Sequence, residues 1–125
     1  MSKILLVDDE TEFVEMLAFR LAKAGYEVLQ AYDGEEGLLK ARAEHPDLVL
    51  LDIWMPKKDG FEVCRELKSS PETAGIPVIF LTASTATQTT DQIRGTGAVD
   101  FMRKPFDPAQ MMAKIKTTLE ANKHV

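Results

Sequence analysis

The sequence has little of what a secreted or membrane-bound chain needs. It contains one cysteine, Cys64, so no disulfide can form within the chain. After Met-Ser-Lys only four apolar residues follow in a row, fewer than the apolar region of a signal peptide requires. No stretch approaches the roughly 20 apolar residues of a membrane span. These absences predict a cytoplasmic protein without membrane attachment.

Positive charge is also scarce. Lys and Arg number 15 against 20 Asp and Glu, which gives a net charge of -5. This excess of acids argues against a nucleic-acid interface spread over the molecule, so we expect no direct nucleic-acid binding by this domain. A length of 125 residues with 45% hydrophobic content suffices for one sizeable core. We therefore expect residues 1–125 to form a single domain.

Continuous apolar runs predict buried β-strands. The clearest are Ile4–Val7, Leu48–Leu51 and Pro77–Leu81. A run that is apolar at every position suits a strand covered on both faces, as in a parallel sheet. Two further predicted strands are short: Val28–Ala31 and Ala98–Met102.

Segments with apolar residues at one-face helical spacing alternate with these runs. The second such segment should end before His45, because a residue that precedes Pro disfavours the helical region. The segment Ser84–Thr96 is rich in Thr and has Ile93 as its clear apolar anchor, so we expect a short or mobile fourth helix there. The other predicted helices are Thr11–Ala24, Gly34–Glu44, Asp59–Ser69 and a last one from Pro108.

Strands that alternate with helices predict βα units, a parallel sheet and right-handed crossovers. All strands of such a sheet end at the same edge. Neighbouring strands lie about 4.8 Å apart, so Lys104 would lie two strands, about 10 Å, from Asp52 if the first and fourth strands flank the third. A lysine side chain can lean across that gap. The polar residues expected at this edge are Asp8, Asp9, Asp52, Thr82 and Lys104.

This group of side chains suits phosphoryl transfer. Converging carboxylates repel one another unless a cation lies among them, and Mg²⁺ prefers such hard oxygen ligands. Asp52 would then act as a nucleophile. The Thr82 hydroxyl and the Lys104 ammonium would neutralise charge on the phosphoryl oxygens.

Each residue also has a purely structural explanation. Acids at Asp8, Asp9 and Glu10 favour the start of a helix through the helix dipole. A threonine often ends a strand, and a lysine is usually a solvated surface charge. Asp59-Gly60 is best explained as a turn and helix start, and Cys64 as a small buried hydrophobe. The convergence of several titratable groups on one edge favours the functional interpretation for the first set.

Four segments in this order resemble the receiver domain of bacterial two-component response regulators, of which chemotaxis regulators are examples. The resemblance covers essentially the whole chain. It implies a doubly wound, flavodoxin-like sheet of strand order 2-1-3-4-5, with the switch point between strands 1 and 3. The segments are LVDDE (6–10), LLDIWMPKKDG (50–60), FLTA (80–83) and GAVDFMRKPF (97–106).

The resemblance also implies roles for single residues. Asp52 would be the phosphoacceptor. A histidine kinase, a phosphotransfer protein or acetyl phosphate would supply the phosphoryl group. Mg²⁺ would be held by Asp9 and Asp52 directly, by Asp8 through water, and by the backbone carbonyl of Trp54, whose indole we expect to lie exposed over the site. Thr82 and Lys104 would bind the phosphoryl oxygens.

In this family, movement of the residue at Thr82 lets the aromatic ring at Phe101 turn inward. This changes the face made by the fourth helix, the fifth strand and the fifth helix, where a downstream protein binds. Phe101 has no hydroxyl, so it would switch by ring burial alone. The bond between Lys104 and Pro105 is typically cis in the family.

The leading functional prediction is a phosphorylation-controlled signalling domain, with at most slow self-dephosphorylation, and not an enzyme that turns over. The alternative is a Mg-dependent phosphatase or phosphotransferase with an aspartyl nucleophile. Such enzymes usually carry a second acid two residues after the nucleophile, where this chain has Trp54. A nucleotide or flavin carrier is disfavoured, because no Gly-rich loop follows the first strand.

Overall fold

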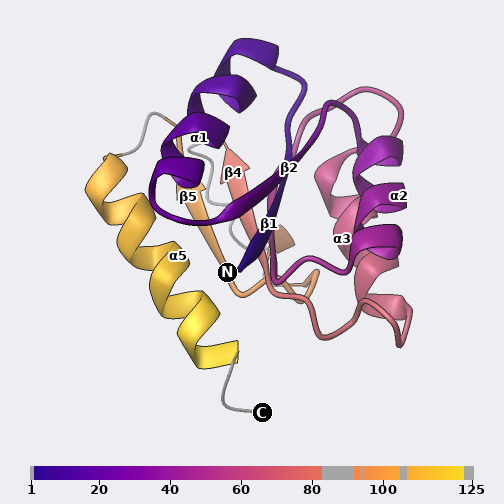
Figure 1. The fold of residues 1–125 in the computed structure, drawn as a ribbon. Helices are drawn as coiled ribbons and strands as arrows, with labels where there is room; N and C mark the ends of the chain where they lie inside the picture. The colour runs from indigo at the N-terminus through magenta and orange to yellow at the C-terminus, as the bar shows by residue number, and fades with distance from the viewer. Residues whose placement is uncertain (1, 83–91, 94, 105–106, 123–125) are drawn as a thin grey trace.

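The computed structural model describes residues 2–82, 92–93, 95–104 and 107–122, and Figure 1 shows their fold. Five strands form one parallel sheet in the order β2-β1-β3-β4-β5, which confirms the predicted fold class and strand order. The strands are β1 (Lys3–Val7), β2 (Glu27–Ala31), β3 (Leu48–Asp52), β4 (Val78–Thr82) and β5 (Asp100–Arg103). The described helices are α1 (Thr11–Lys23), α2 (Gly34–Glu44), α3 (Gly60–Ser69) and α5 (Pro108–Asn122).

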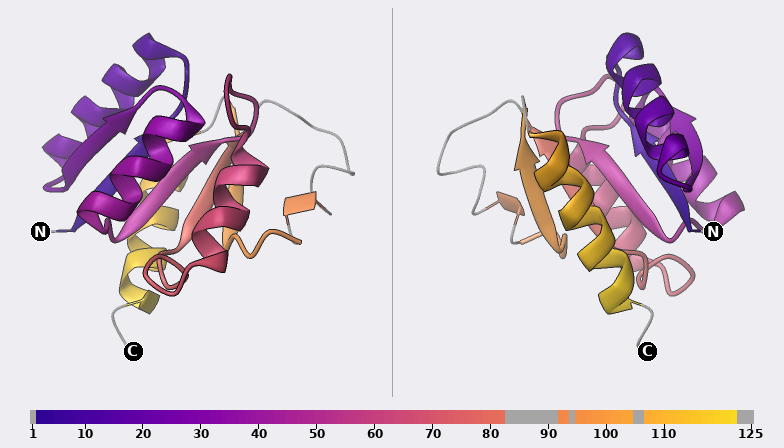
Figure 2. Two further views of the ribbon diagram at one scale, coloured as in Figure 1. Left: turned by 90° about the vertical axis from the view of Figure 1, so that its right-hand side faces the viewer. Right: turned by 60° about the vertical axis from the view of Figure 1, so that its left-hand side comes forward.

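Helices cover both faces of the sheet. α1 and α5 lie on one face, and α2 and α3 lie on the other (Figure 2). Because each strand sends alternate side chains to opposite faces, the strands contribute to both cores. Leu50 belongs to the core with Leu17 and Ile115, whereas its neighbour Leu51 belongs to the core with Leu38.

β3 is the middle strand, and all five of its residues are buried. Its apolar run is continuous because helices cover both of its faces, as the sequence predicts. Burying one leucine side chain contributes about 1.5–3 kcal/mol, so β3 is a major source of stability. Leu51 pairs with Val7 of β1 and with Phe80 of β4. The ends of β1, β3 and β4 therefore lie side by side at one edge of the sheet.

Aspartates cap the two helices that follow β2 and β3. The N–H of Glu36 donates to Asp33 Oδ1 over 2.8 Å, and the N–H of Glu62 donates to Asp59 Oδ1 over 2.9 Å. Such a cap satisfies one of the free N–H groups at a helix start. The structural interpretation of Asp59 as a helix start is confirmed.

α2 ends at Glu44, as predicted, but the backbone of His45, the residue that follows, is not extended. The prediction rested on the preference of a residue before proline for an extended backbone. His45 instead has φ 47° and ψ 61°, the left-handed conformation. Its N–H donates to the Ala41 carbonyl over 3.0 Å, which satisfies an otherwise free carbonyl at the helix end.

The predicted starts of β4 and β5 are wrong. β5 begins at Asp100 and not at Ala98, because a turn at residues 95–97, in which Gly97 has φ 89°, comes directly before Ala98, and the Ala98 N–H donates to Thr96 Oγ1. β4 begins after Pro77, which has no N–H to donate to the sheet.

Most of the predicted fourth helix, residues 84–91 and 94, falls outside the described residues. Its expected anchor, Ile93, is described and is buried in the core on the α2/α3 face. Within the described part of the chain, no helix is both long enough and apolar enough to cross a bilayer.

Gly60 has no room for a side chain, which gives a test of how α3 packs on β3. A Cβ at this position would lie 2.3 Å from the carbonyl oxygen of Asp52 and 2.8 Å from the Cα of Ile53. Because both are backbone atoms, Gly60→Ala should lower the free energy of unfolding by about 1–3 kcal/mol in urea denaturation. Gly75→Ala is the matched control, since nothing lies within 4 Å of that Cβ position. Equal losses in both variants would contradict the packing argument.

Candidate functional site

Three carboxylates converge where β1 and β3 end. Oxygen atoms of Asp8, Asp9 and Asp52 all lie within 4.8 Å of one another. Asp8 and Asp52 are buried, whereas Asp9 is exposed. The strand order reverses between β1 and β3, and this is where doubly wound sheets bind ligands. The convergence predicted from the sequence is therefore present.

Lys104 crosses from the end of β5 to this cluster. Its ammonium donates to Asp8 Oδ2 over 2.5 Å and to Glu10 Oε1 over 3.1 Å, and it lies 3.9 Å from Asp52 Oδ1. Its backbone N–H donates to the Thr82 carbonyl over 2.7 Å, which ties the residue to the end of β4. The predicted reach of Lys104 is confirmed, and its hydrogen bonds go to Asp8 and Glu10.

Burial and like charge set the electrostatics of the site. The pKa of Asp52 is raised to about 7: burial is the largest cause, the charge of Asp8 adds to it, and Lys104 and the Ile53 N–H oppose the rise. Burial likewise raises the pKa of Asp8, although the hydrogen bond from Lys104 opposes this. Both acids are thus harder to ionise than an ordinary aspartate, and a cation among them would reduce this cost.

The chemistry of the donors fits a divalent cation. Three carboxylates within reach of one point supply hard oxygen ligands, and Mg²⁺ binds such ligands together with water and phosphate.

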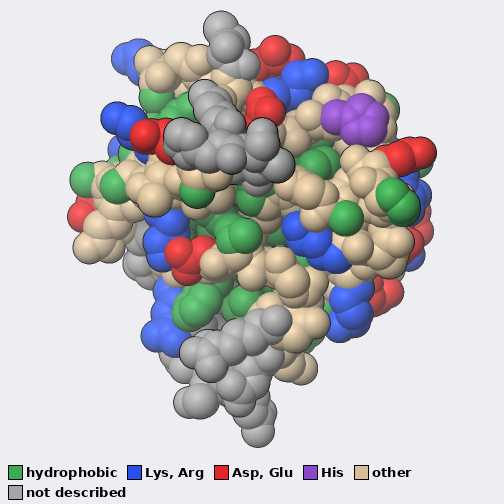
Figure 3. Space-filling view, turned by 90° about the horizontal axis from the view of Figure 1, so that it is seen from below, with side chains coloured by type: hydrophobic (Ala, Val, Ile, Leu, Met, Phe, Trp, Pro, Cys, Tyr) green, Lys and Arg blue, Asp and Glu red, His purple; other side chains and the backbone are tan. Residues whose placement is uncertain are grey.

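The opposite end of the molecule, seen in Figure 3, carries acidic and basic side chains interspersed with apolar ones.

The remaining predicted residues take up distinct positions. Thr82 is buried at the end of β4, beside Arg103 in the sheet register. Trp54 is 58% exposed, and its ring makes an edge contact with Phe61 at 5.9 Å between centroids. Exposure of the Trp54 indole matches the expectation. Pro105 lies outside the described residues.

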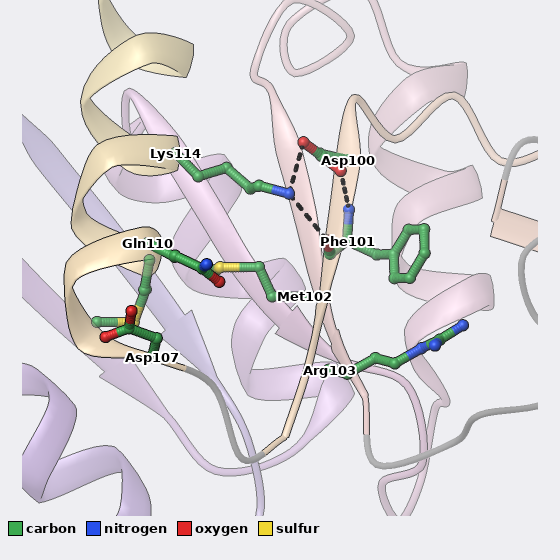
Figure 4. A pocket seen from close by; sticks show the side chains of 8 residues that line it. Asp100, Phe101, Met102, Arg103, Asp107, Gln110 and Lys114 are labelled. Atoms are coloured by element: carbon green, nitrogen blue, oxygen red, sulfur yellow. Dashed lines mark hydrogen bonds and ion pairs between the residues drawn. The ribbon is translucent and has the colours of Figure 1, made fainter.

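Phe101 is half-buried on β5 and lies beside a groove between β5 and α5, shown in Figure 4. The Arg103 guanidinium lies 5.7 Å from the centre of its ring. Lys114 of α5 pairs with Asp100 over 3.1 Å and donates to the Phe101 carbonyl over 3.4 Å. This groove forms part of the face that the resemblance assigns to a downstream partner.

Two residues near Lys104 are not predicted as parts of the site by the sequence. The pattern predicts Glu10 only as an acid at a helix start and assigns no role to Phe13. The Phe13 ring centre lies 4.4 Å from the Lys104 ammonium. No short sequence pattern links Phe13 to Lys104, because only the tertiary fold brings α1 beside the end of β5.

A family model of the response regulator receiver domain matches residues 4–116. The chain belongs to this family. It is 44% identical over 119 residues to the alkaline phosphatase synthesis transcriptional regulatory protein PhoP of Bacillus subtilis, which covers 94% of this chain and 48% of PhoP. It is 42% identical over 121 residues to the DNA-binding dual master transcriptional regulator RpaA of Synechocystis. This match covers 95% of this chain and 49% of RpaA. The chain thus spans about half the length of the curated relatives it matches.

Solved receiver structures have the same fold. The signal receiver domain of a signal transduction histidine kinase from Syntrophus aciditrophicus has a TM-score of 0.93 and 31% identity, covering 100% of this chain and 95% of that one. Chemotaxis protein CheY4 of Vibrio cholerae has a TM-score of 0.89 and 31% identity, covering 94% and 98%. The predicted membership of the receiver family is confirmed, and the chain is a signalling domain rather than a dedicated enzyme.

The buried carboxylate of Asp52 should make stability depend on pH. Its pKa is about 7 when folded against 3.8 for an ordinary aspartate, so the folded state binds more protons between these values. Its contribution to stability therefore falls as pH rises from about 4 to 7, and Asp52→Asn should stabilise the metal-free chain by about 1–3 kcal/mol at pH 8 but not near pH 4. Urea denaturation measures this, with the exposed Asp107→Asn as control. Equal stabilisation at both pH values would contradict it.

Trp54 is the one tryptophan of the chain, so its fluorescence reports on the site alone. Its ring is largely exposed and stands two residues after Asp52. Titration with Mg²⁺ should change the emission, and Asp9→Asn should shift the change to higher Mg²⁺ concentration because a ligand is lost. An unchanged emission at saturating Mg²⁺ would contradict the placement of Trp54 beside the metal.

Proposed function

We propose that this receiver domain is controlled by phosphorylation of Asp52. The observation that carries the proposal is the meeting of a buried carboxylate with two further acids and an ammonium at the switch point of the sheet. The groups come from the ends of β1, β3 and β5 or the turns after them, so the fold brings together residues that are far apart in the chain.

The reaction is transfer of a phosphoryl group to a carboxylate. An Asp52 oxygen attacks phosphorus as the bond from phosphorus to the donor breaks; the donor leaves as acetate from acetyl phosphate, or as imidazole from a phosphohistidine. The product is an acyl phosphate, and positioning with charge neutralisation supplies the catalysis. Asp52 must be ionised to attack.

Asp9, Asp52 and the Trp54 carbonyl would hold Mg²⁺ directly, and Asp8 through water. When bound, the metal neutralises charge on the carboxylates and on the phosphoryl oxygens. Lys104 would bind a phosphoryl oxygen, and its position 3.9 Å from Asp52 Oδ1 supports this role. Thr82, at the end of β4 next to Asp52, would bind another.

Phosphorylation would act through Thr82 and Phe101. Phe101 is half-buried and packs against the core on the α2/α3 face, so inward rotation would increase its apolar burial. Its carbonyl and the neighbouring Asp100 contact Lys114, which links the switch residue to α5. A downstream protein would bind the face formed by β5, α5 and the predicted fourth helix.

The wider context follows from the family. A histidine kinase or phosphotransfer protein in the cytoplasm would be the donor, because response regulators receive phosphate in this way. Residues 1–125 would act as one domain, and any nucleic-acid binding would belong to another part of the protein, since RpaA is described as DNA-binding and the chain matches 49% of it.

The competing function is a Mg-dependent phosphatase or phosphotransferase. Such enzymes usually carry a second acid two residues after the nucleophile, and here that position holds the exposed Trp54. We therefore propose slow self-dephosphorylation at most.

Incubation with acetyl phosphate and Mg²⁺ tests the proposal. One phosphate per chain should appear, stable in acid and labile in base, and then decay slowly. Asp52→Asn should abolish it, with Asp59→Asn as control, because Asp59 only caps α3. Labelling that persists in Asp52→Asn would overturn the assignment, and continuous release of phosphate would favour the enzyme.

A further inference from the structure

Lys104 contacts an aromatic ring as well as the carboxylates. Its ammonium lies 4.4 Å from the centre of the Phe13 ring, which α1 holds half-buried beside the core. A cation within about 6 Å of an aromatic face is attracted to it, and more strongly where water is excluded. The Lys104 side chain is only 13% exposed, so this contact is largely shielded from water.

The partners of this ammonium differ in how firmly they can hold it. Glu10 is 66% exposed, so solvent weakens its ion pair with Lys104. Asp8 faces the shared carboxylate cluster, and a cation bound there competes with Lys104 for its charge. The ring of Phe13 has no net charge and binds no metal. Its contact with Lys104 is therefore independent of which cation the acids hold.

The location of the ring matters as much as its chemistry. Asp8, Glu10 and Phe13 belong to one short stretch from the end of β1 into the first turn of α1. Asp52, which Lys104 must reach, ends the neighbouring strand. The ammonium of a lysine is carried on a flexible four-carbon stem. A fixed ring surface beside it limits the positions that the ammonium can sample.

We propose that Phe13 is a positioning residue whose ring face holds the Lys104 ammonium beside Asp52, where it meets the incoming phosphoryl oxygens. This inference rests on the proposed function. Loss of the ring would leave every carboxylate in place but would let Lys104 move towards solvent. Phosphoryl transfer would then slow without loss of the site.

The test compares rate constants for phosphorylation of the full chain by acetyl phosphate at saturating Mg²⁺. Phe13→Leu removes the ring but keeps apolar volume, and should slow phosphorylation about three- to tenfold. Phe13→Tyr keeps a ring and should restore the rate to within about twofold of the original. Phe19→Leu is the matched control, because Phe19 is also on α1 and lies 5.2 Å from a lysine, Lys23, away from the cluster. It should not change the rate.

Two further measurements separate positioning from general stability. Protons of the Lys104 side chain that lie over a ring resonate upfield in NMR, and this shift should vanish in Phe13→Leu and persist in Phe13→Tyr. In a Lys104→Met background, Phe13→Leu should cause no additional loss of rate, because the ring acts only through Lys104. Thermal unfolding of each variant confirms that it is folded.

The outcomes distinguish the two proposals. Normal labelling of Asp52 with an unchanged rate in Phe13→Leu overturns the role of Phe13 and leaves the proposed function intact. Additive losses of phosphorylation rate from Phe13→Leu and Lys104→Met also overturn it. The same holds if the Lys104 side-chain protons resonate at the same position in Phe13→Leu as in the original chain. Failure of the original chain to be labelled at Asp52 overturns the proposed function, and the inference with it.

Discussion

Repulsion between the buried carboxylates of Asp8 and Asp52 is the constraint on which the site depends. Burial is the largest cause that raises the pKa of each acid, and the charge of Asp8 further raises the cost of ionising Asp52. Lys104 offsets part of this cost. Its ammonium nitrogen lies 2.5 Å from Asp8 Oδ2 but 3.9 Å from Asp52 Oδ1. Asp52 is therefore the less compensated of the two carboxylates.

The rest of the fold keeps these groups from moving apart. β3 is buried on both faces, so its end cannot relax towards solvent. Gly60 lets α3 start against the backbone of Asp52, and the Gly60 N–H donates to the Ile53 carbonyl over 2.6 Å. Lys104 is tied through its N–H to the Thr82 carbonyl. A site that is electrostatically unfavourable persists because rigid packing around it leaves no easy relaxation.

Local patterns predicted much of this fold. Continuous apolar runs located the strands, apolar spacing located α1 and α2, and the turn at Asp59-Gly60 located the start of α3. Boundaries failed where a turn decided them: Gly97 and the bond from the Ala98 N–H to Thr96 delay β5 to Asp100. The predicted extended backbone of His45 was also wrong. The hydrogen bond from the His45 N–H to the Ala41 carbonyl, which ends α2, outweighs the preference imposed by the following proline. Strand order came from the family resemblance, since apolar runs alone do not say which strands are neighbours.

The sequence by itself determined which side chains stand at strand ends, because the polar residue after an apolar run is encoded by consecutive positions. It thereby determined that Asp8, Asp52, Thr82 and Lys104 share one edge of a parallel sheet. Only the tertiary structure decided which of them touch. Lys104 bonds to Asp8 and Glu10, with the ring of Phe13 against it, although more than 90 residues separate these partners. Such contacts depend on sheet twist and on how α1 packs on its face, and neither is written in any short stretch of the chain.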